Sequence, residues 1–193
     1  MRKYLLTLAL AGGFAFGPAD AAEDPELEAF VAGSRAMVDE SASSLKSALQ
    51  AAIEEGGPTN AISVCNVKAP GIAGALSRHP QWRIGRTSHK VRNPNNAPDA
   101  WEAGVLEEFL QRAAAGESFS TMEKAERVEG SGGALYRFMK AIPVGDICLT
   151  CHGTDVVPDL KSKIDAYYPT DEATGFKMGE LRGAFTITKA AQN

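Results

Sequence analysis

The sequence is short of cysteine, of basic charge and of long apolar runs. Its 193 residues include three cysteines, which are too few for a disulfide scaffold and odd in number, so at least one thiol stays unpaired. Lysine and arginine total 20 against 24 aspartates and glutamates, for a net charge of -4. Binding to nucleic-acid phosphates needs a clustered basic surplus that this composition does not supply, so we expect no nucleic-acid partner.

The apolar runs are too short to cross a membrane, which takes about 20 residues in a helix. The apolar stretch at residues 4–16 follows the basic pair Arg2-Lys3 and precedes Ala19-Asp20-Ala21, whose small residues suit a cleavage site. This order is typical of a secretory signal peptide. We therefore expect residues 1–21 to be a signal peptide. Residues 22–193 should form a single domain that is periplasmic or otherwise exported, with no membrane span after cleavage.

Helical periodicity dominates the beginning of the expected domain. Asp24-Pro25 is a helix cap followed by a first-turn proline, and apolar residues then recur every three or four positions. This pattern predicts a long N-terminal helix that ends at residues 56–58, Gly-Gly-Pro. A second helix should begin at Thr59 or Asn60 and include Cys65, and Pro70 should interrupt it before residues 72–76 resume.

Strand-like alternation dominates the later part of the chain. A helix capped by Asp99 and closed by Gly116 follows an Asn- and Pro-rich loop at residues 92–98. Strands are predicted at residues 81–87, 122–128, 134–142 and 183–188, with a glycine-rich hairpin joining the second and third. Early helices followed by a run of strands indicate an α+β domain with an antiparallel sheet.

The chemistry lies in Cys148-Leu149-Thr150-Cys151-His152. Two thiols separated by two residues and followed by histidine form the attachment signature of a c-type haem. Each thiol adds to one vinyl group of the porphyrin, and the spacing places the adjacent imidazole under the iron as the proximal ligand. With three cysteines and three histidines in the chain, chance would produce this pattern about one time in a thousand.

Three alternatives to haem attachment fit the paired thiols less well. A thioredoxin-like pair needs a preceding strand within a βαβ unit, and residues 142–146 are expected to be a loop. A zinc site needs a second ligand pair at ordered spacing, which His79 and His89 do not provide. The third alternative is a plain disulfide, but the motif together with the export signal favours haem. We therefore expect one covalent haem c and no disulfide.

Cys65 is the leftover thiol, and its surroundings leave two interpretations open. It lies between Ile62, Val64 and Val67 on an expected helix, where a free cysteine often serves as a small buried hydrophobe. Alternatively, its thiolate is the second axial ligand of the haem iron. The other candidates for that position are His89, His79, Met178, Met139 and Met122. The histidines fall in polar loops or turns, and methionines at strand or loop positions are usually core residues.

Several segments in this order resemble a family of bacterial c-type haem domains, long catalogued as a domain of unknown function. The residues that carry the resemblance are Asn60 to Asn66 with Ala69-Pro70, Ile84 to Ser88, Lys90 to Asn95, Trp101-Glu102, Lys140 to Ile142, Cys148 to Gly153, Tyr168-Pro169 with Asp171, and Leu181 to Phe185. The chain departs from the family pattern at Phe176 and Glu180, where the family has tyrosine and aspartate.

The resemblance implies a PAS-like antiparallel β-sheet flanked by helices, one covalent haem, His152 as proximal ligand and Cys65 as the opposite ligand. Members of the family occur alone or as periplasmic sensor domains of histidine kinases. This chain ends shortly after its last expected strand, so we expect no output domain and any signalling to need a partner protein. Arg86 and Arg92, before and within the Asn-Pro loop, are candidates to pair with the haem propionates.

Three function classes follow from these expectations. A redox or gas sensor would let a diatomic such as CO or NO displace Cys65, and an electron-transfer cytochrome would exchange electrons with a redox partner protein. A haem enzyme needs an open iron position, which two protein ligands remove, so we do not expect an enzyme. A thiolate ligand donates negative charge to the iron and predicts a low reduction potential.

Overall fold

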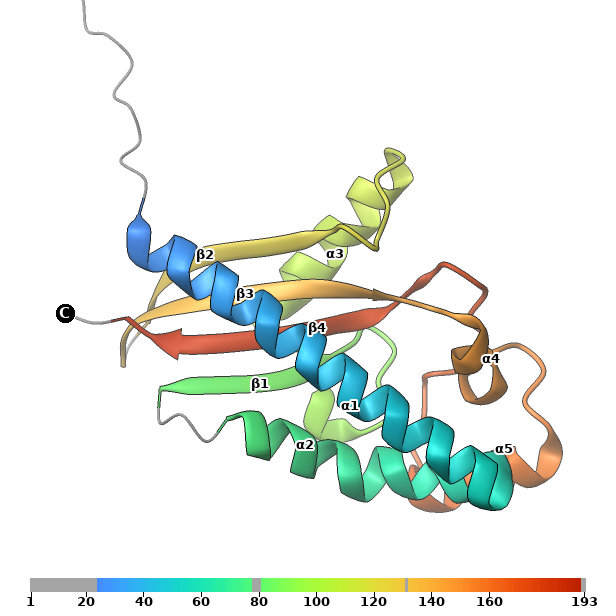
Figure 1. The fold of residues 1–193 in the computed structure, drawn as a ribbon. Helices are drawn as coiled ribbons and strands as arrows, with labels where there is room; N and C mark the ends of the chain where they lie inside the picture. The colour runs from blue at the N-terminus through green and yellow to red at the C-terminus, as the bar shows by residue number, and fades with distance from the viewer. Residues whose placement is uncertain (1–23, 78–80, 131, 192–193) are drawn as a thin grey trace, which may run out of the picture.

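The computed structural model describes residues 24–77, 81–130 and 132–191, and the expected signal peptide and His79 lie outside these ranges. A four-stranded antiparallel sheet with the order β1-β4-β3-β2 forms its centre. The strands are β1 (Trp82–Thr87), β2 (Glu123–Gly130), β3 (Gly133–Pro143) and β4 (Leu181–Ala190). The last strand, β4, thus lies in the sheet between β1 and β3 and pairs with both of them (Figure 1). The predicted α+β fold with a PAS-like sheet is confirmed.

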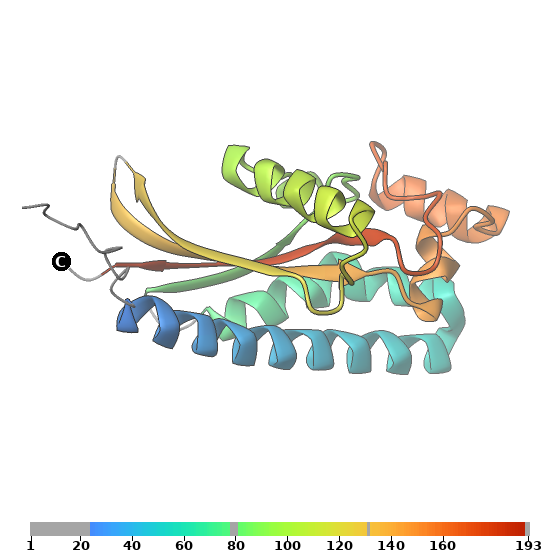
Figure 2. The same cartoon turned by 90° about the horizontal axis from the view of Figure 1, so that it is seen from above.

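Helices cover both faces of the sheet and one of its ends. The long helix α1 (Pro25–Ser63), the π-helical turn η1 (Val64–Lys68) and α2 (Ala69–Leu76) lie on one face. The helix α3 (Ala100–Ala114) lies on the opposite face (Figure 2). The short helices α4 (Asp146–His152) and α5 (Pro158–Tyr167) lie beyond the end of the sheet, beside the C-terminal part of α1.

Two hydrophobic layers fix the helices to the sheet. Phe138 of β3 packs with Phe30 of α1 on one face, and the next residue, Met139, packs with Phe109 of α3 on the other. All four side chains are fully buried. Because successive strand residues point to opposite faces, β3 supplies both layers at once. The core therefore holds β3 and β4 in a fixed position relative to α1 and α3.

The N-terminal helix begins where the sequence predicts and bends where a helix end is predicted. Asp24 caps it, with its carboxylate accepting from the backbone N–H groups of Glu26 and Leu27. Gly56 and Gly57 have non-helical backbone angles, and the helix then resumes beyond Pro58 as far as Ser63. The predicted end is therefore a kink between two helical stretches, and the second stretch leads directly to Cys65.

The prediction that Pro70 interrupts the second helix is wrong. The chain passes through the π-helical turn η1 into α2, and Pro70 stands in the first turn of α2. A proline is tolerated there because its missing N–H is not needed. The N–H of Ala69 donates to the carbonyl of Val64, five residues back, so the wider turn replaces the predicted break.

The remaining predictions differ from the structure mainly around the thiol pair. The four strands, the helix after Asp99 and the loop at residues 92–98 are confirmed, with a single 3-10 turn (Pro94–Asn96) inside the loop. Asp99 forms a full capping box with Glu102. The helices α4 and α5 are not predicted, although Pro158 and the buried residues Leu160 and Ile164 mark α5.

The packing of α3 on the sheet gives a direct test of this core. Phe109 is fully buried, whereas the adjacent Leu110 is 36% exposed. We expect Phe109→Ala to lower the free energy of unfolding by about 3–5 kcal/mol, because it removes a large buried ring and leaves a cavity. Leu110→Ala, the control on the same helix, should cost less than about 1 kcal/mol. Urea denaturation measures both, and equal losses would contradict the packing described.

Candidate functional site

The thiol pair and the histidine lie on α4, and Gly153 follows His152 directly in the sequence. Cys148 and Cys151 are three residues apart on this helix, so they lie on neighbouring positions of one face. The N–H of Gly153 donates to the carbonyl of Leu149 at 2.8 Å. A Cβ at position 153 would stand 2.5 Å from that carbonyl oxygen, so the tight end of α4 requires glycine. The motif is thus held on a short helix with a sharp stop after His152.

The imidazole of His152 is oriented by the backbone of a later loop. Its Nδ1 lies 2.7 Å from the carbonyl oxygen of Ala173, which can only accept, so Nδ1 carries the proton. Burial lowers the pKa of His152 well below its usual value, and the charges of Arg182 and Arg92 lower it further. The ring is therefore neutral, and Nε2 has a free lone pair with which to bind a metal.

A cavity of about 320 Å³ joins the thiol pair, His152 and Cys65. This volume is within the range of about 300–1,000 Å³ that is usual for cofactor sites. Its apolar walls come mainly from α1 and from the ends of the strands. The apolar side chains that line it are Ala42, Leu45, Leu49, Ile53, Ala61, Ile62, Val91, Ile142, Ile147 and Phe185.

Cys65 reaches this cavity from the π-helical turn η1, far from α4 in the sequence. Its side chain is half-buried and is not part of the hydrophobic core, which excludes the interpretation as a small core residue. Burial raises the pKa of the Cys151 thiol, Arg92 lowers it, and the nearby Cys65 and Cys148 raise it again. The three thiols therefore share one environment, and none of them is in a disulfide.

The other candidates for an axial ligand lie elsewhere. Met122 and Met139 are fully buried between α3 and the sheet, and Met178 is 51% exposed. His89 is exposed and meets Phe176 edge-on. None of these four lines the cavity, and His79 lies outside the described residues. Of the candidates that the structure describes, Cys65 alone lines the cavity together with His152.

The three thiols and His152 line the cavity but do not lie close enough together to coordinate a metal ion directly. Within residues 24–77, 81–130 and 132–191, no group of three or more His, Cys, Asp or Glu side chains is close enough to hold a metal ion by itself. A flat cofactor between Cys65 and α4 would use the same side chains without requiring them to meet.

Two arginines bring uncompensated positive charge to the cavity. Arg86 of β1 and Arg182 of β4 both line it, and in the described part of the chain neither has a carboxylate within ion-pair distance. Burial lowers the pKa of Arg86. Burial, together with the charges of Arg92 and Arg86, lowers the pKa of Arg182 to about 10. Two half-buried cations that lack ion-pair partners favour an anionic ligand. Arg182 is a site residue that no sequence motif singled out, although it lies in the segment Leu181 to Phe185.

Arg92 also lines the cavity, but its guanidinium is engaged inside the protein. It forms a forked ion pair with Asp171, with Nε–Oδ1 and Nη2–Oδ2 distances of 3.0 Å each. Nη2 also donates to the carbonyls of Cys151 at 2.7 Å and Ala173 at 3.2 Å. The pairing with Asp171 could not be read from the sequence, because the two residues are far apart in the chain.

Comparison with known proteins identifies the family of this chain and a solved structure with the same fold. The family model Tll0287-like, described as Tll0287, matches residues 22–189. The chain belongs to the Tll0287-like family. The crystal structure of the cyanobacterial heme-protein Tll0287 is similar, with a TM-score of 0.61 and 23% sequence identity over 89% of this chain and 99% of that chain. No curated protein matches the sequence.

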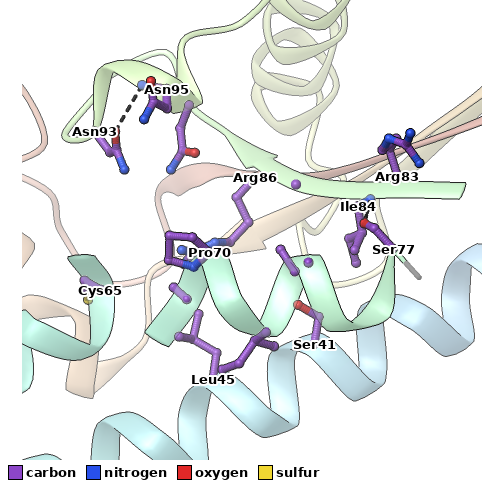
Figure 3. Close-up of a pocket in the computed structure, with 16 residues that line it drawn as sticks. Ser41, Leu45, Cys65, Pro70, Ser77, Arg83, Ile84, Arg86, Asn93 and Asn95 are labelled. Atoms are coloured by element: carbon purple, nitrogen blue, oxygen red, sulfur yellow. Dashed lines mark hydrogen bonds between the residues drawn. The ribbon is translucent and has the colours of Figure 1, made fainter. Parts of the chain in front are cut away.

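In this member of the Tll0287-like family, Cys65 also lines a second cavity of about 390 Å³. It is bounded by α1, α2, β1 and the Asn-Pro loop, and Cys65, Leu45 and Arg86 line both cavities. Figure 3 shows the side chain of Arg86 reaching from β1 toward Pro70. No aspartate or glutamate is among the residues that line this second cavity. Cys65 therefore borders open space in addition to the cavity that it shares with α4.

None of the helices in the described residues of this family member is long and apolar enough to span a membrane.

The cavity also depends on the close approach of two strand ends. Gly183 in β4 has a φ of 155°, and a Cβ there would stand 2.3 Å from the carbonyl oxygen of Thr87. The hydroxyl of Ser88 lies 2.7 Å from the carbonyl oxygen of Arg182 and accepts from its Nη1 at 2.9 Å. Glycine at position 183 thus lets β4 bring Arg182 to the end of β1.

We expect Gly183→Ala to lower the free energy of unfolding by more than about 1 kcal/mol, because the added methyl meets backbone that cannot move freely. Gly104→Ala on α3 is the matched control, since nothing lies within 4 Å of its added Cβ. The control should stabilise the protein by about 0.5–1 kcal/mol through helix propensity. Thermal or urea unfolding measures both variants, and stabilisation by both would show that β4 does not need the glycine.

Proposed function

We propose that this protein is an exported c-type haem protein that acts as a redox or gas sensor and is not an enzyme. One haem would be attached through Cys148 and Cys151, with His152 and Cys65 as its axial ligands. The observation that carries the proposal is the convergence of these four side chains on one cavity from α4 and η1. The similar cyanobacterial protein is described as a heme-protein, which supports haem as the cofactor.

The residues around the cavity fit a haem. Apolar side chains suit the porphyrin faces, and the paired thiols lie at the spacing that covalent attachment needs. Arg86 and Arg182 supply the positive charge that two propionates would neutralise, and their lack of carboxylate partners in the described residues favours them for this role. Arg92 is also a candidate, but its guanidinium is paired with Asp171, so we propose Arg86 and Arg182 ahead of it as partners of the propionates.

A haem supplies one-electron chemistry at its iron, and the axial ligands tune the reduction potential. His152 presents Nε2 because its Nδ1–H is held by the carbonyl of Ala173. Cys65 would donate a negative charge from the opposite side of the cavity and stabilise the ferric state. If His152 and Cys65 both bind the iron, no position would remain open for a substrate, which is why we do not propose an enzyme.

Sensing is favoured by the surroundings of Cys65. Its π-helical turn follows the kink at Gly56-Gly57, and the second cavity offers space into which the thiol can withdraw. π-Helical turns are frequent at functional sites. Withdrawal of Cys65 would open one side of the cavity to a diatomic such as CO or NO.

Export belongs to the proposal, because residues 1–21 have the order of a signal peptide.

A small electron-transfer cytochrome is the second candidate. The observation that favours it is that His152 and Cys65 line one cavity from two separate elements, α4 and η1, since two fixed ligands would permit electron exchange without a change in coordination. The two candidates differ in whether Cys65 leaves the iron after reduction. A redox or signalling partner protein is part of either proposal.

The ligand assignment is tested by Cys65→Ser. We expect the variant to keep covalent haem, because Cys148 and Cys151 are unchanged, and to lose the low-spin thiolate signature in absorption and EPR spectra. The double variant Cys148→Ser with Cys151→Ser is the control and should lose covalent haem, as measured by mass spectrometry of the denatured protein. A thiolate signature that persists unchanged in Cys65→Ser would remove Cys65 from the iron.

The sensor proposal is tested by adding CO to the dithionite-reduced protein. We expect a change in the absorption spectrum, because reduction weakens the iron–thiolate bond and Cys65 can withdraw. Reduced Cys65→Ser should bind CO at least as fast, since no thiolate competes. An unchanged wild-type spectrum at saturating CO would contradict the sensor proposal, and electron exchange with an added redox protein would then favour the electron carrier.

A further inference from the structure

Arg92 joins three segments that are far apart in the sequence. Its guanidinium comes from the loop after β1 and donates to the carboxylate of Asp171, to the carbonyl of Cys151 at the end of α4 and to the carbonyl of Ala173. The side chains of Arg92 and Asp171 are 9% and 1% exposed. A forked, buried pair with further hydrogen bonds is rigid, because moving either partner leaves an unpaired charge away from water.

The same pair holds Ala173 at both of its backbone groups. The N–H of Ala173 donates to Oδ1 of Asp171 at 2.9 Å, and its carbonyl oxygen accepts from Arg92. That carbonyl oxygen is also the acceptor for Nδ1–H of His152, at 2.7 Å. The ion pair therefore sets the position of the atom that orients the imidazole, and it does so through Ala173, because the hydrogen bonds of Arg92 and Asp171 go to other groups than the ring.

Other contacts would keep this loop in place without the ion pair. The N–H groups of Phe176 and Gly175 donate to the carbonyls of His152 and Gly153 at 2.9 Å each. The ring of Phe176 also meets the ring of His152 edge-on, with centroids 6.3 Å apart. Loss of the ion pair should therefore loosen Ala173 and its hydrogen bond to the imidazole while α4 and the loop remain attached.

We propose that Arg92 and Asp171 are positioning residues that fix the hydrogen bond from His152 to Ala173 and so tune the proximal ligand. This inference rests on the proposed function, in which His152 binds the iron. A hydrogen bond from Nδ1–H makes the imidazole a stronger donor and fixes its orientation. The pair also keeps the charge of Arg92 neutralised beside the cavity, so both effects of the carboxylate stabilise the ferric state.

Asp171→Asn tests the proposal on the purified holoprotein. We expect its reduction potential to rise, because the imidazole becomes a weaker donor and Arg92 is left uncompensated. The low-spin EPR signal should broaden or split, because the ring orientation is no longer single. Asp165→Asn is the matched control, since it removes an exposed carboxylate paired with Lys161 on α5 and should change neither readout. A wild-type potential and EPR signal in haem-loaded Asp171→Asn would overturn the proposal.

Arg92→Lys and Asp171→Glu separate position from charge, and they serve if Asp171→Asn does not fold. Both variants keep the charges. Lysine lacks the planar, forked guanidinium that reaches three acceptors, and the longer glutamate side chain would displace the guanidinium of Arg92. We expect a potential closer to that of the wild type, with the EPR signal still broadened. A sharp wild-type signal in both variants would show that only charge matters and would overturn the positioning role.

A second measurement distinguishes failure of the proposed function from failure of this inference. If the wild-type protein carries no covalent haem, the function proposed above is wrong, and the positioning role is then read from the tautomer of His152 by nitrogen-15 NMR. We expect the Nδ1–H tautomer alone in the wild type and a mixture of tautomers in Asp171→Asn. The same single tautomer in both proteins would overturn the inference independently of haem.

Discussion

The buried ion pair between Arg92 and Asp171 is the interaction on which the site depends. It connects the loop after β1, the end of α4 and the loop that carries Ala173, and each of these borders the cavity. Two charges taken out of water must remain paired, so the three segments have one relative arrangement. The neutral imidazole of His152, with Nε2 free, follows from that arrangement, because the same network places the carbonyl that accepts from Nδ1.

The cavity shows the reverse situation, in which charges are left without protein partners. Arg86 and Arg182 converge from neighbouring strands, and burial lowers the pKa of both. The approach of β4 to β1 at Gly183 brings them together, and it costs the chain a φ value that only glycine adopts easily. A cavity with apolar walls and two arginines that lack carboxylate partners in the described residues suits a ligand that is largely apolar and carries negative charge. A haem with two propionates has this character.

Local sequence signals predicted most of the fold. The cap at Asp24, the capping box at Asp99 and the alternation in β3 are properties of adjacent residues, and the structure confirms them. The prediction at Pro70 is wrong because a π-helical turn accommodates the proline, and the hydrogen-bond register of a single turn has no clear sequence pattern. The helix α4 was missed because a seven-residue helix is too short for periodicity to reveal it.

The sequence by itself predicted haem attachment at the Cys148 to His152 segment, because the spacing of these residues is set by the local chain. The residues alone left several candidates for a second ligand, and only the resemblance pointed to Cys65. The tertiary structure decides which candidates line the cavity, since packing buries Met122 and Met139 in the core, leaves Met178 and His89 at the surface and places Cys65 beside the cavity. Partners from distant segments, such as Asp171 for Arg92, likewise depend on how the helices and strands pack, which no local pattern records.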